Sequence, residues 1–184
     1  MKNLIEFLDL GLQPLANNYQ KKGKKITKEK KYKLKIQFNK KTKLVSIKDT
    51  FSSKIMFNNK YPYRSSMSST MLSSFKKLSL EIKKNYKPKK ILEIGSNDGS
   101  FLKNFDKNIT IGIEPCSNIE KITKKKGFDT YSEYWSKKLA KKLIKKYSNV
   151  DLIYSANTIT HIKNLDQVFK SILSILSKKG LLII

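Results

Sequence analysis

The stretch Leu92–Phe101, LEIGSNDGSF, constrains the fold of this chain more than any other part of its sequence. Leu92 to Ile94 belong to an apolar run that is typical of a buried strand. Gly95 and Gly99 then bracket a turn of small polar residues, which tolerate the unusual backbone angles that such a turn requires. A strand, a glycine turn and the start of a helix, in this order, can close a backbone around a nucleotide-like cofactor.

Strand and helix patterns alternate from Lys89 to the last residue of the chain. Apolar runs predict strands at 89–95, 109–115, 128–132, 150–157 and 180–184. Apolar residues at helical spacing predict helices at 100–105, 117–127, 132–148 and 164–176. This alternation predicts an α/β fold with a parallel, doubly wound, Rossmann-like sheet of five strands.

The region before Pro88 has a different pattern. Residues 31–47 alternate between apolar and polar side chains around a polar turn at 39–43, and this predicts a β-hairpin. Apolar residues then recur at helical spacing between Met67 and Ile82, which predicts a helix with one buried face. A small hairpin and a helix are therefore expected ahead of the sheet.

Pro88 separates these two patterns and suggests the domain organisation. We expect an N-terminal region at 1–87 and a Rossmann-like domain at 88–184. The second region ends within its fifth predicted strand. Because a domain rarely finishes on a strand buried in a sheet, we expect the chain to be a fragment, truncated after that strand.

Lysine dominates the charged residues. Of the 40 basic residues, 39 are lysine and one, Arg64, is arginine, and the net charge is +26. Proteins that read nucleic acid rely on arginine for bidentate and stacking contacts, and the lysines here are spread over every segment. We therefore expect a solvated basic surface and no specific nucleic-acid partner, with a nonspecific attraction to polyanions.

The sequence also limits compartment and metal chemistry. No apolar run approaches the ~18 residues of a membrane span, and Glu6 and Asp9 interrupt the apolar N-terminus, so neither a membrane partner nor a signal peptide is expected. The single cysteine, Cys116, excludes an internal disulfide and a zinc site built on cysteines. These features predict a cytoplasmic enzyme with no metal site.

Two acidic residues near the glycine turn narrow the choice of cofactor. Glu93 lies in the first strand, and Glu114 ends the second strand 19 residues after Gly95, where dinucleotide folds place a ribose-binding acid. A pyrophosphate fingerprint has glycine where this chain has Asn97 and Ser100. S-adenosylmethionine (SAM) has the ribose without the pyrophosphate, and Glu93 can serve its ammonium group. The pattern favours SAM, with another nucleotide or an ordinary turn as alternatives.

Several segments together resemble a known enzyme family. They are EIGSNDGSFL, GIEP, ANTITHIKNLDQVF, FLDLGLQPLANNY and YPYRSSMSSTM, which span essentially the whole chain in order. These segments are similar to the class I SAM-dependent C-methyltransferases that act on nucleotide-linked deoxy-keto sugars. The resemblance implies methyl transfer from SAM to a nucleotide-linked 4-keto-6-deoxy sugar as the small-molecule substrate.

The pattern and the resemblance together assign roles to individual residues. The residues expected to bind SAM are Tyr63, Glu93, Gly95, Ser96, Asn97, Asp98, Gly99, Glu114 and Asn157. Glu114 would bind the ribose, and Tyr63 lies in a segment that closes over the cofactor, where its hydroxyl would reach the methionine carboxylate. His161 would face the sugar as a catalytic residue and hydrogen-bond the keto oxygen as it becomes an enolate. A lone histidine past a strand end is also often structural.

The chain departs from this family at both ends. The family begins with a zinc module of two CxxC pairs, and Asn39 and Thr42 stand where the second pair would fall, so no zinc is expected. The family's Tyr/His/Glu-rich catalytic motif and a C-terminal domain lie beyond the fifth strand. The probable base of the reaction is therefore missing, and we expect these 184 residues to be inactive alone.

Two other functions stay open. One is a basic, noncatalytic nucleic-acid-binding protein on a Rossmann-like core, which would bind RNA or DNA in a salt-sensitive way and have no affinity for SAM. The other is a methyltransferase of the same fold that acts on a small metabolite other than a sugar. Calorimetry with SAM would distinguish the nucleic-acid-binding protein from a SAM-dependent enzyme. The sequence offers little to distinguish a small-metabolite methyltransferase from a sugar methyltransferase.

Overall fold

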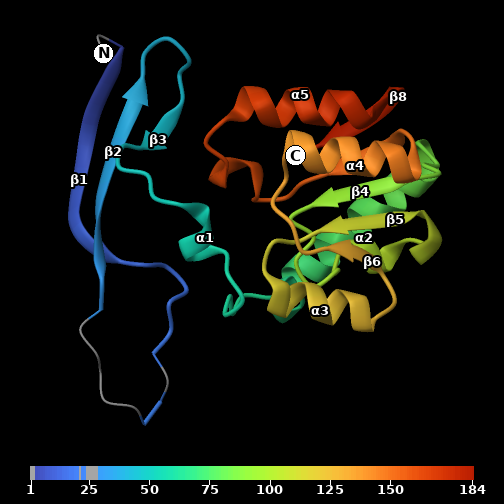
Figure 1. Cartoon of the computed structure of the whole chain (residues 1–184), viewed down its shortest axis with the longest axis horizontal. Coiled ribbons are helices and arrows are strands. Elements are labelled where there is room, and N and C mark those ends of the chain that lie inside the picture. The colour runs from blue at the N-terminus through green and yellow to red at the C-terminus, as the bar shows by residue number, and fades with distance from the viewer. Residues whose placement is uncertain (1–2, 21, 24–28) are drawn as a thin grey trace. The chain divides into compact units, whose positions relative to one another are not determined.

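A computed structural model describes residues 3–20, 22–23 and 29–184 of the chain (Figure 1). The chain divides into two compact units, Met1–Met56 and Phe57–Ile184. The helix that precedes Pro88 packs against the sheet of the second unit. This division therefore lies upstream of the boundary at 87/88 that the sequence pattern suggests.

The first unit is a three-stranded antiparallel sheet in the order β1-β2-β3. Its elements are β1 (Leu4–Pro14), β2 (Lys31–Asn39), β3 (Val45–Ile47) and the short helix α1 (Ser53–Met56). β2 and β3 form the predicted hairpin, with Ile36 opposite Ile47 and Phe38 opposite Val45. β1 pairs with β2, although its sequence pattern did not predict a strand.

Ion pairs on one face of this sheet explain the acidic residues that interrupt the pattern of β1. Lys35 on β2 contacts Glu6 at 2.9 Å and Asp9 at 2.8 Å. Lys48 contacts Glu6 at 2.7 Å. Hydrogen bonds from Lys48 and, to a smaller extent, Lys35 lower the pKa of Glu6. A hydrogen bond from Lys35 is the largest of the effects that lower the pKa of Asp9. Such exposed pairs contribute little to stability, but they mark which face of β1 is polar.

The Asn39 side chain closes the hairpin turn. Its Oδ1 accepts hydrogen bonds from the backbone amides of Lys41 and Thr42 at 2.9 and 3.1 Å. The Asn39 carbonyl accepts from the amide of Lys43 at 2.7 Å, and the Asn39 amide donates to the carbonyl of Leu44 at 2.9 Å. An asparagine that accepts from amides two and three residues ahead mimics a backbone turn. The turn is therefore held by its own polar groups.

The second unit is a five-stranded parallel sheet in the order β6-β5-β4-β7-β8. Its strands are β4 (Ile91–Ile94), β5 (Thr110–Ile113), β6 (Asp129–Tyr131), β7 (Val150–Tyr154) and β8 (Leu176–Ile183). Its α-helices are α2 (Ser69–Asn85), α3 (Ser117–Lys125), α4 (Lys137–Tyr147) and α5 (Leu165–Ile175). Short 3₁₀ helices lie at Ser65–Met67, Leu102–Asn104, Lys107–Ile109 and Ile159–His161. The predicted α/β fold class is confirmed.

Helices cover both faces of this parallel sheet (Figure 1). α4 and α5 pack on one face through residues such as Leu143 and Ile172, and α2 packs on the other face through Phe75 and Ile82. The strand order reverses between β4 and β7, so the carboxyl ends of these two strands form the switch point where doubly wound sheets bind ligands. No helix among the described residues has the length and apolar character needed to cross a membrane.

The short helix predicted at 100–105 forms as a single 3₁₀ turn, Leu102–Asn104. The Asn104 side chain donates to the carbonyl oxygens of Ser100 and Phe101 at 3.2 and 2.9 Å. These are carbonyls that a continuing α-helix would use, and Phe105 already has an extended backbone. The glycine turn therefore has no α-helix N-terminus directly behind it.

Replacing Asn39 with alanine should loosen the hairpin turn, because two amides lose their acceptor. We expect hydrogen exchange at the Lys41 and Thr42 amides to become about fivefold faster, as the loss of ~1 kcal/mol predicts. Asn39→Asp keeps an acceptor oxygen and serves as the control that retains most of the protection. Equal exchange in the wild type and the alanine variant would contradict the role given to this side chain.

Candidate functional site

Three loops meet at the carboxyl edge of the parallel sheet, where β4, β5 and β7 end. The strand register holds Ile94 level with Ile113 and Glu93 level with Tyr154. The hydroxyl of Ser155 joins two of these strand ends by donating to the carbonyl oxygen of Ile94 at 3.0 Å. Residues that are far apart in the sequence are thereby brought to one edge.

The glycine turn after β4 has a left-handed backbone at three positions. φ is 79° at Gly95, 46° at Asn97 and 76° at Gly99. A Cβ on Gly95 would lie 2.0 Å from Oγ1 of Thr158, so no larger residue fits there. The Gly95 amide donates to the carbonyl of Ile113 at 2.8 Å. The turn therefore folds back over the end of β5.

Glu114 ties this turn to the loop after β5. Its two carboxylate oxygens accept from the backbone amides of Asn97 and Cys116 at 2.9 and 2.8 Å. Glu114 is buried, and burial raises its pKa although these two hydrogen bonds oppose the shift. A carboxylate offers about four acceptor positions. Each oxygen of Glu114 therefore keeps capacity for a further donor, such as a ribose hydroxyl.

Glu93 is a buried carboxyl group within the sheet. Only 3% of the residue is exposed, and Oε2 has no hydrogen-bond partner within the described part of the chain. Burial raises the pKa of Glu93 well above its ordinary value, and Glu114 and Asp98 raise it further. Burial and the neighbouring Glu93 also raise the pKa of Tyr154 to about 12. A cationic ligand would stabilise the charged form of Glu93.

Two buried hydroxyl groups lie over Gly112, next to Glu93 in the sheet. A Cβ on Gly112 would lie 2.7 Å from Oγ of Ser96 and 3.0 Å from Oγ1 of Thr130, and neither oxygen has a partner among the described residues. Gly112 pairs with Glu93 on one side and Thr130 on the other, which places the three residues in one row across the sheet. Sequence reasoning missed Thr130, because only strand register brings it here.

Residues 57–66, called the strap below, are tied to the glycine turn. The Asn97 side chain accepts from the Ser65 amide at 2.8 Å and donates to the Tyr63 carbonyl at 3.2 Å. Tyr63 thus reaches the turn through its backbone, while its side chain is 42% exposed. The strap is further held from α3, where the Asn118 side chain donates to the Tyr61 carbonyl at 2.8 Å.

Both carboxylate oxygens and the backbone carbonyl of Asp98 accept hydrogen bonds from other residues of the chain. Oδ1 accepts from the Ser100 hydroxyl at 2.6 Å, and Oδ2 accepts from the Ser66 amide at 3.3 Å. Lys126 donates to the Asp98 carbonyl at 2.9 Å. Burial acts to raise the pKa of Asp98, but the Ser100 and Ser66 hydrogen bonds and the Lys126 charge together hold it below its ordinary value. Asp98 therefore stays ionised and fixes the turn against the strap.

Asn157 and His161 lie in the loop after β7, and both are exposed. Asn157 has a left-handed φ of 52°. His161 ends a 3₁₀ helix, and its ring packs against Phe57 of the strap with 5.2 Å between ring centroids. The structure therefore brings His161 to the strap, while Tyr63, Asn97 and Glu114 form the connected centre of the site.

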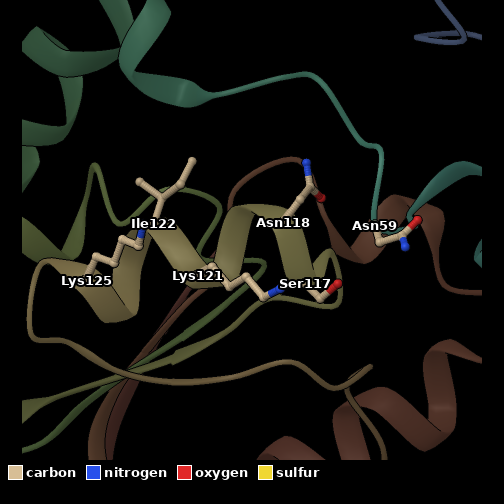
Figure 2. Close-up of a pocket in the computed structure, with 6 residues that line it drawn as sticks. All are labelled: Asn59, Ser117, Asn118, Lys121, Ile122 and Lys125. Carbon is tan, nitrogen blue, oxygen red and sulfur yellow. The ribbon is translucent and has the colours of Figure 1, made fainter.

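An open cavity of about 380 Å³ lies along α3 (Figure 2). It is lined by Asn59, Ser117, Asn118, Lys121, Ile122 and Lys125. All of these residues belong to α3 or to the strap. None of them is among the residues predicted to bind a cofactor.

Two family profiles match the chain in succession. Residues 63–184 match the family described as "Methyltransferase domain", and residues 1–57 match the one described as "Putative zinc binding domain". No curated protein matches the chain. The two matched ranges follow the division of the structure into two units closely.

Solved structures of methyltransferases align with part of this chain. A "putative O-methyltransferase" from Nostoc punctiforme PCC 73102 aligns with a TM-score of 0.50 and 18% identity over 64% of this chain and 38% of that one. The plantazolicin methyltransferase BpumL, bound to a desmethylPZN analog and SAH, aligns with a TM-score of 0.47 and 19% identity over 61% and 45%. A "putative s-adenosyl-l-methionine-dependent methyltransferase" from Methanococcus maripaludis aligns with a TM-score of 0.49 and 15% identity over 65% and 59%. This chain spans less than two thirds of each of them.

The residues of the first unit do not fit a zinc ion. Its sequence, residues 1–56, contains neither cysteine nor histidine, the ligands on which structural zinc sites are built. Within residues 3–20, 22–23 and 29–184, no three acidic, histidine or cysteine side chains gather as metal ligands. The only cysteine, Cys116, is buried in the second unit.

The methyltransferase match covers more than half of the chain and includes every element of the parallel sheet. It also includes the glycine turn, both buried acids and the loop after β7. The chain belongs to the methyltransferase-domain family.

Proposed function

We propose that residues 57–184 bind SAM and that the chain is a SAM-dependent methyltransferase. The observation that carries this proposal is the pair of buried carboxyls, Glu93 and Glu114, at the carboxyl edge of the sheet. Glu114 spans two loops and keeps acceptor capacity, and Glu93 keeps an oxygen without a partner among the described residues. These groups match the ribose hydroxyls and the ammonium group of SAM, respectively.

The backbone around the turn also favours SAM over a dinucleotide. A pyrophosphate is normally held at the N-terminus of an α-helix that follows the glycine turn. Here residues 102–104 form only a 3₁₀ helix, and the carboxylates of Glu93, Asp98 and Glu114 surround the turn. A cofactor with positive groups and no pyrophosphate suits this environment better than a dianionic one.

The remaining predicted residues complete the proposed site. Gly95 and Gly99 let the backbone approach the cofactor, and Ser96 presents its hydroxyl below the turn. Tyr63 would contact the methionine carboxylate, and Asn157 would lie beside the cofactor at the end of β7. When bound, SAM supplies an electrophilic methyl group, and the task of the chain is to hold and align it.

The acceptor we propose is a nucleotide-linked 4-keto-6-deoxy sugar, methylated at carbon. The succession of a zinc-domain match and a methyltransferase-domain match supports this assignment, as does a histidine beside the strap. An imidazole N–H of His161 would donate to the keto oxygen as negative charge develops there. The alternative is a different small-molecule acceptor on the same fold.

Binding of S-adenosylhomocysteine (SAH), measured by calorimetry, tests the proposed cofactor. We expect the wild type to bind it and Glu114→Gln to bind roughly 10- to 100-fold more weakly, the effect of losing hydrogen bonds to a charged group. Glu133→Gln is the matched control, because Glu133 forms a surface ion pair with Lys142 at 2.7 Å. It should bind like the wild type.

A folded wild type with no measurable SAH affinity would overturn this proposal. If the same protein then bound RNA or DNA tightly and in a salt-sensitive way, a noncatalytic nucleic-acid-binding function would replace it. Circular dichroism and thermal unfolding of each variant separate loss of binding from loss of fold.

The raised pKa of Glu93 makes a prediction about pH. A carboxyl whose pKa is higher in the folded state favours folding at low pH, and this contribution is lost as pH rises above the ordinary value of 4.5. Glu93→Gln should therefore unfold less readily than the wild type at neutral pH. Its advantage should shrink by at most ~1.4 kcal/mol per pH unit as pH falls and vanish in acid.

Denaturant unfolding of the two proteins across this pH range checks the prediction. A glutamine variant whose free energy of unfolding is lower than that of the wild type by the same amount at every pH would contradict the prediction. It would show that the Glu93 carboxyl group itself stabilises the fold. Glu133→Gln again provides a surface control, for which the pH dependence should follow the wild type.

The proposed acceptor is tested by binding to the SAH-saturated protein, measured by saturation-transfer NMR. We expect a nucleotide-linked 4-keto-6-deoxy sugar to bind, and His161→Ala to weaken this binding about three- to tenfold through one lost hydrogen bond. SAH affinity should be unchanged in this variant. Binding of other small acceptors in place of the sugar nucleotide would support the small-metabolite alternative.

A further inference from the structure

The strap, residues 57–66, is held by polar side chains that bond to its backbone at five positions. Asn97 and Asp98 bond the strap at positions 63, 65 and 66, as described above. Asn118 bonds it at position 61, and the Tyr134 hydroxyl donates to the Phe57 carbonyl at 2.5 Å. Two of these anchors lie in the glycine turn, and two lie outside it.

Asn118 and Tyr134, called the outer anchors, lie outside the glycine turn and bond the strap from other elements. Asn118 is on the first turn of α3, and Figure 2 shows its side chain projecting on the side of the segment that carries Asn59. Tyr134 precedes α4 in the sequence. Because both bond backbone groups, they fix the path of the strap rather than any one side chain of it.

The strap is also linked to the proposed ribose site by a short chain of bonds. The Asn97 side chain holds the strap, and the Asn97 amide bonds Glu114. A change in the path of the strap would therefore act on Asn97, whose backbone amide donates to the Glu114 carboxylate proposed to bind the cofactor. Tyr63, which is proposed to contact the methionine carboxylate, also belongs to the strap.

We propose that Asn118 and Tyr134 are positioning residues, which act on the cofactor site through a strap that opens and closes as one unit. This inference rests on the proposed SAM-binding function. The strap closed by all its anchors is the form that binds the cofactor. The apparent dissociation constant then equals the intrinsic one divided by the closed fraction.

Hydrogen exchange at the Ser65 and Ser66 amides tests whether the strap moves as one unit. The Ser65 amide donates to the Asn97 side chain and the Ser66 amide to the Asp98 side chain. Their hydrogen bonds are therefore different from those made by Asn118 and Tyr134. We expect Asn118→Ala and Tyr134→Phe each to speed their exchange about fivefold, the effect of one lost hydrogen bond on a shared opening step. SAH should slow exchange at both amides in the wild type.

Matched variants separate positioning from general loss of stability. Asn149→Ala removes a similar side-chain bond, from Asn149 to the Ile175 carbonyl at 3.1 Å, far from the strap in the fold. It should leave exchange at Ser65 and Ser66 within about twofold of the wild type. Asn118→Gln keeps an amide donor and should restore part of the protection from exchange that is lost in Asn118→Ala.

Unchanged exchange at Ser65 and Ser66 in both outer-anchor variants would overturn the proposal, because the anchors would then act independently. Acceleration in Asn149→Ala equal to that in Asn118→Ala would overturn it as well. If the wild type fails to bind SAH, the cofactor assignment fails, while exchange in the free protein still decides whether the strap is one unit.

Discussion

The carboxylate of Glu114 is the contact on which the rest of the candidate site depends. It joins the turn after β4 to the loop after β5 by accepting one amide from each. Hydrogen bonds to a charged acceptor are stronger than neutral ones, and burial keeps water from competing for them. Since Glu114 fixes the Asn97 backbone, it also directs the Asn97 side chain that holds the strap. One buried acid thereby organises three segments.

Local pattern was enough to predict the sheet and the residues at its carboxyl edge. Apolar runs such as Ile91–Ile94 and Thr110–Ile113 have the composition of strands buried on both faces, and their spacing leaves room only for parallel crossovers. In a parallel sheet the carboxyl ends share one edge, so Glu114 and Asn157 were expected near the glycine turn. Gly95 and Gly99 were predicted because a left-handed backbone favours glycine.

Features that depend on tertiary contacts could not be predicted in this way. β1 carries acids at positions that only their lysine partners explain, Lys35 on β2 and Lys48 just after β3. The pattern predicts a short helix at 100–105 but not its 3₁₀ form, in which the Asn104 side chain donates to the carbonyl oxygens of Ser100 and Phe101. Asn118 and Tyr134 bond backbone atoms 57 and 77 residues away, and no spacing rule in the sequence signals such bonds.

The charge of the carboxyl edge is opposite to that of the whole chain. The net charge is +26, yet the stretches 91–102 and 108–120, which form the turn and the second loop, contain no lysine or arginine. They contribute the buried acids Glu93, Asp98 and Glu114 around the turn, and Glu120, which pairs with Lys124. Burying acids together is unfavourable, as the raised pKa of Glu93 shows, and apolar residues would pack there at lower cost. The proposed SAM site accounts for such a group, because the bound cofactor would bring positive charge to it. The same acids would repel a phosphate-rich ligand, and Lys126 at this turn is already engaged by Asp98, so attraction of polyanions is expected mainly at the many other lysines.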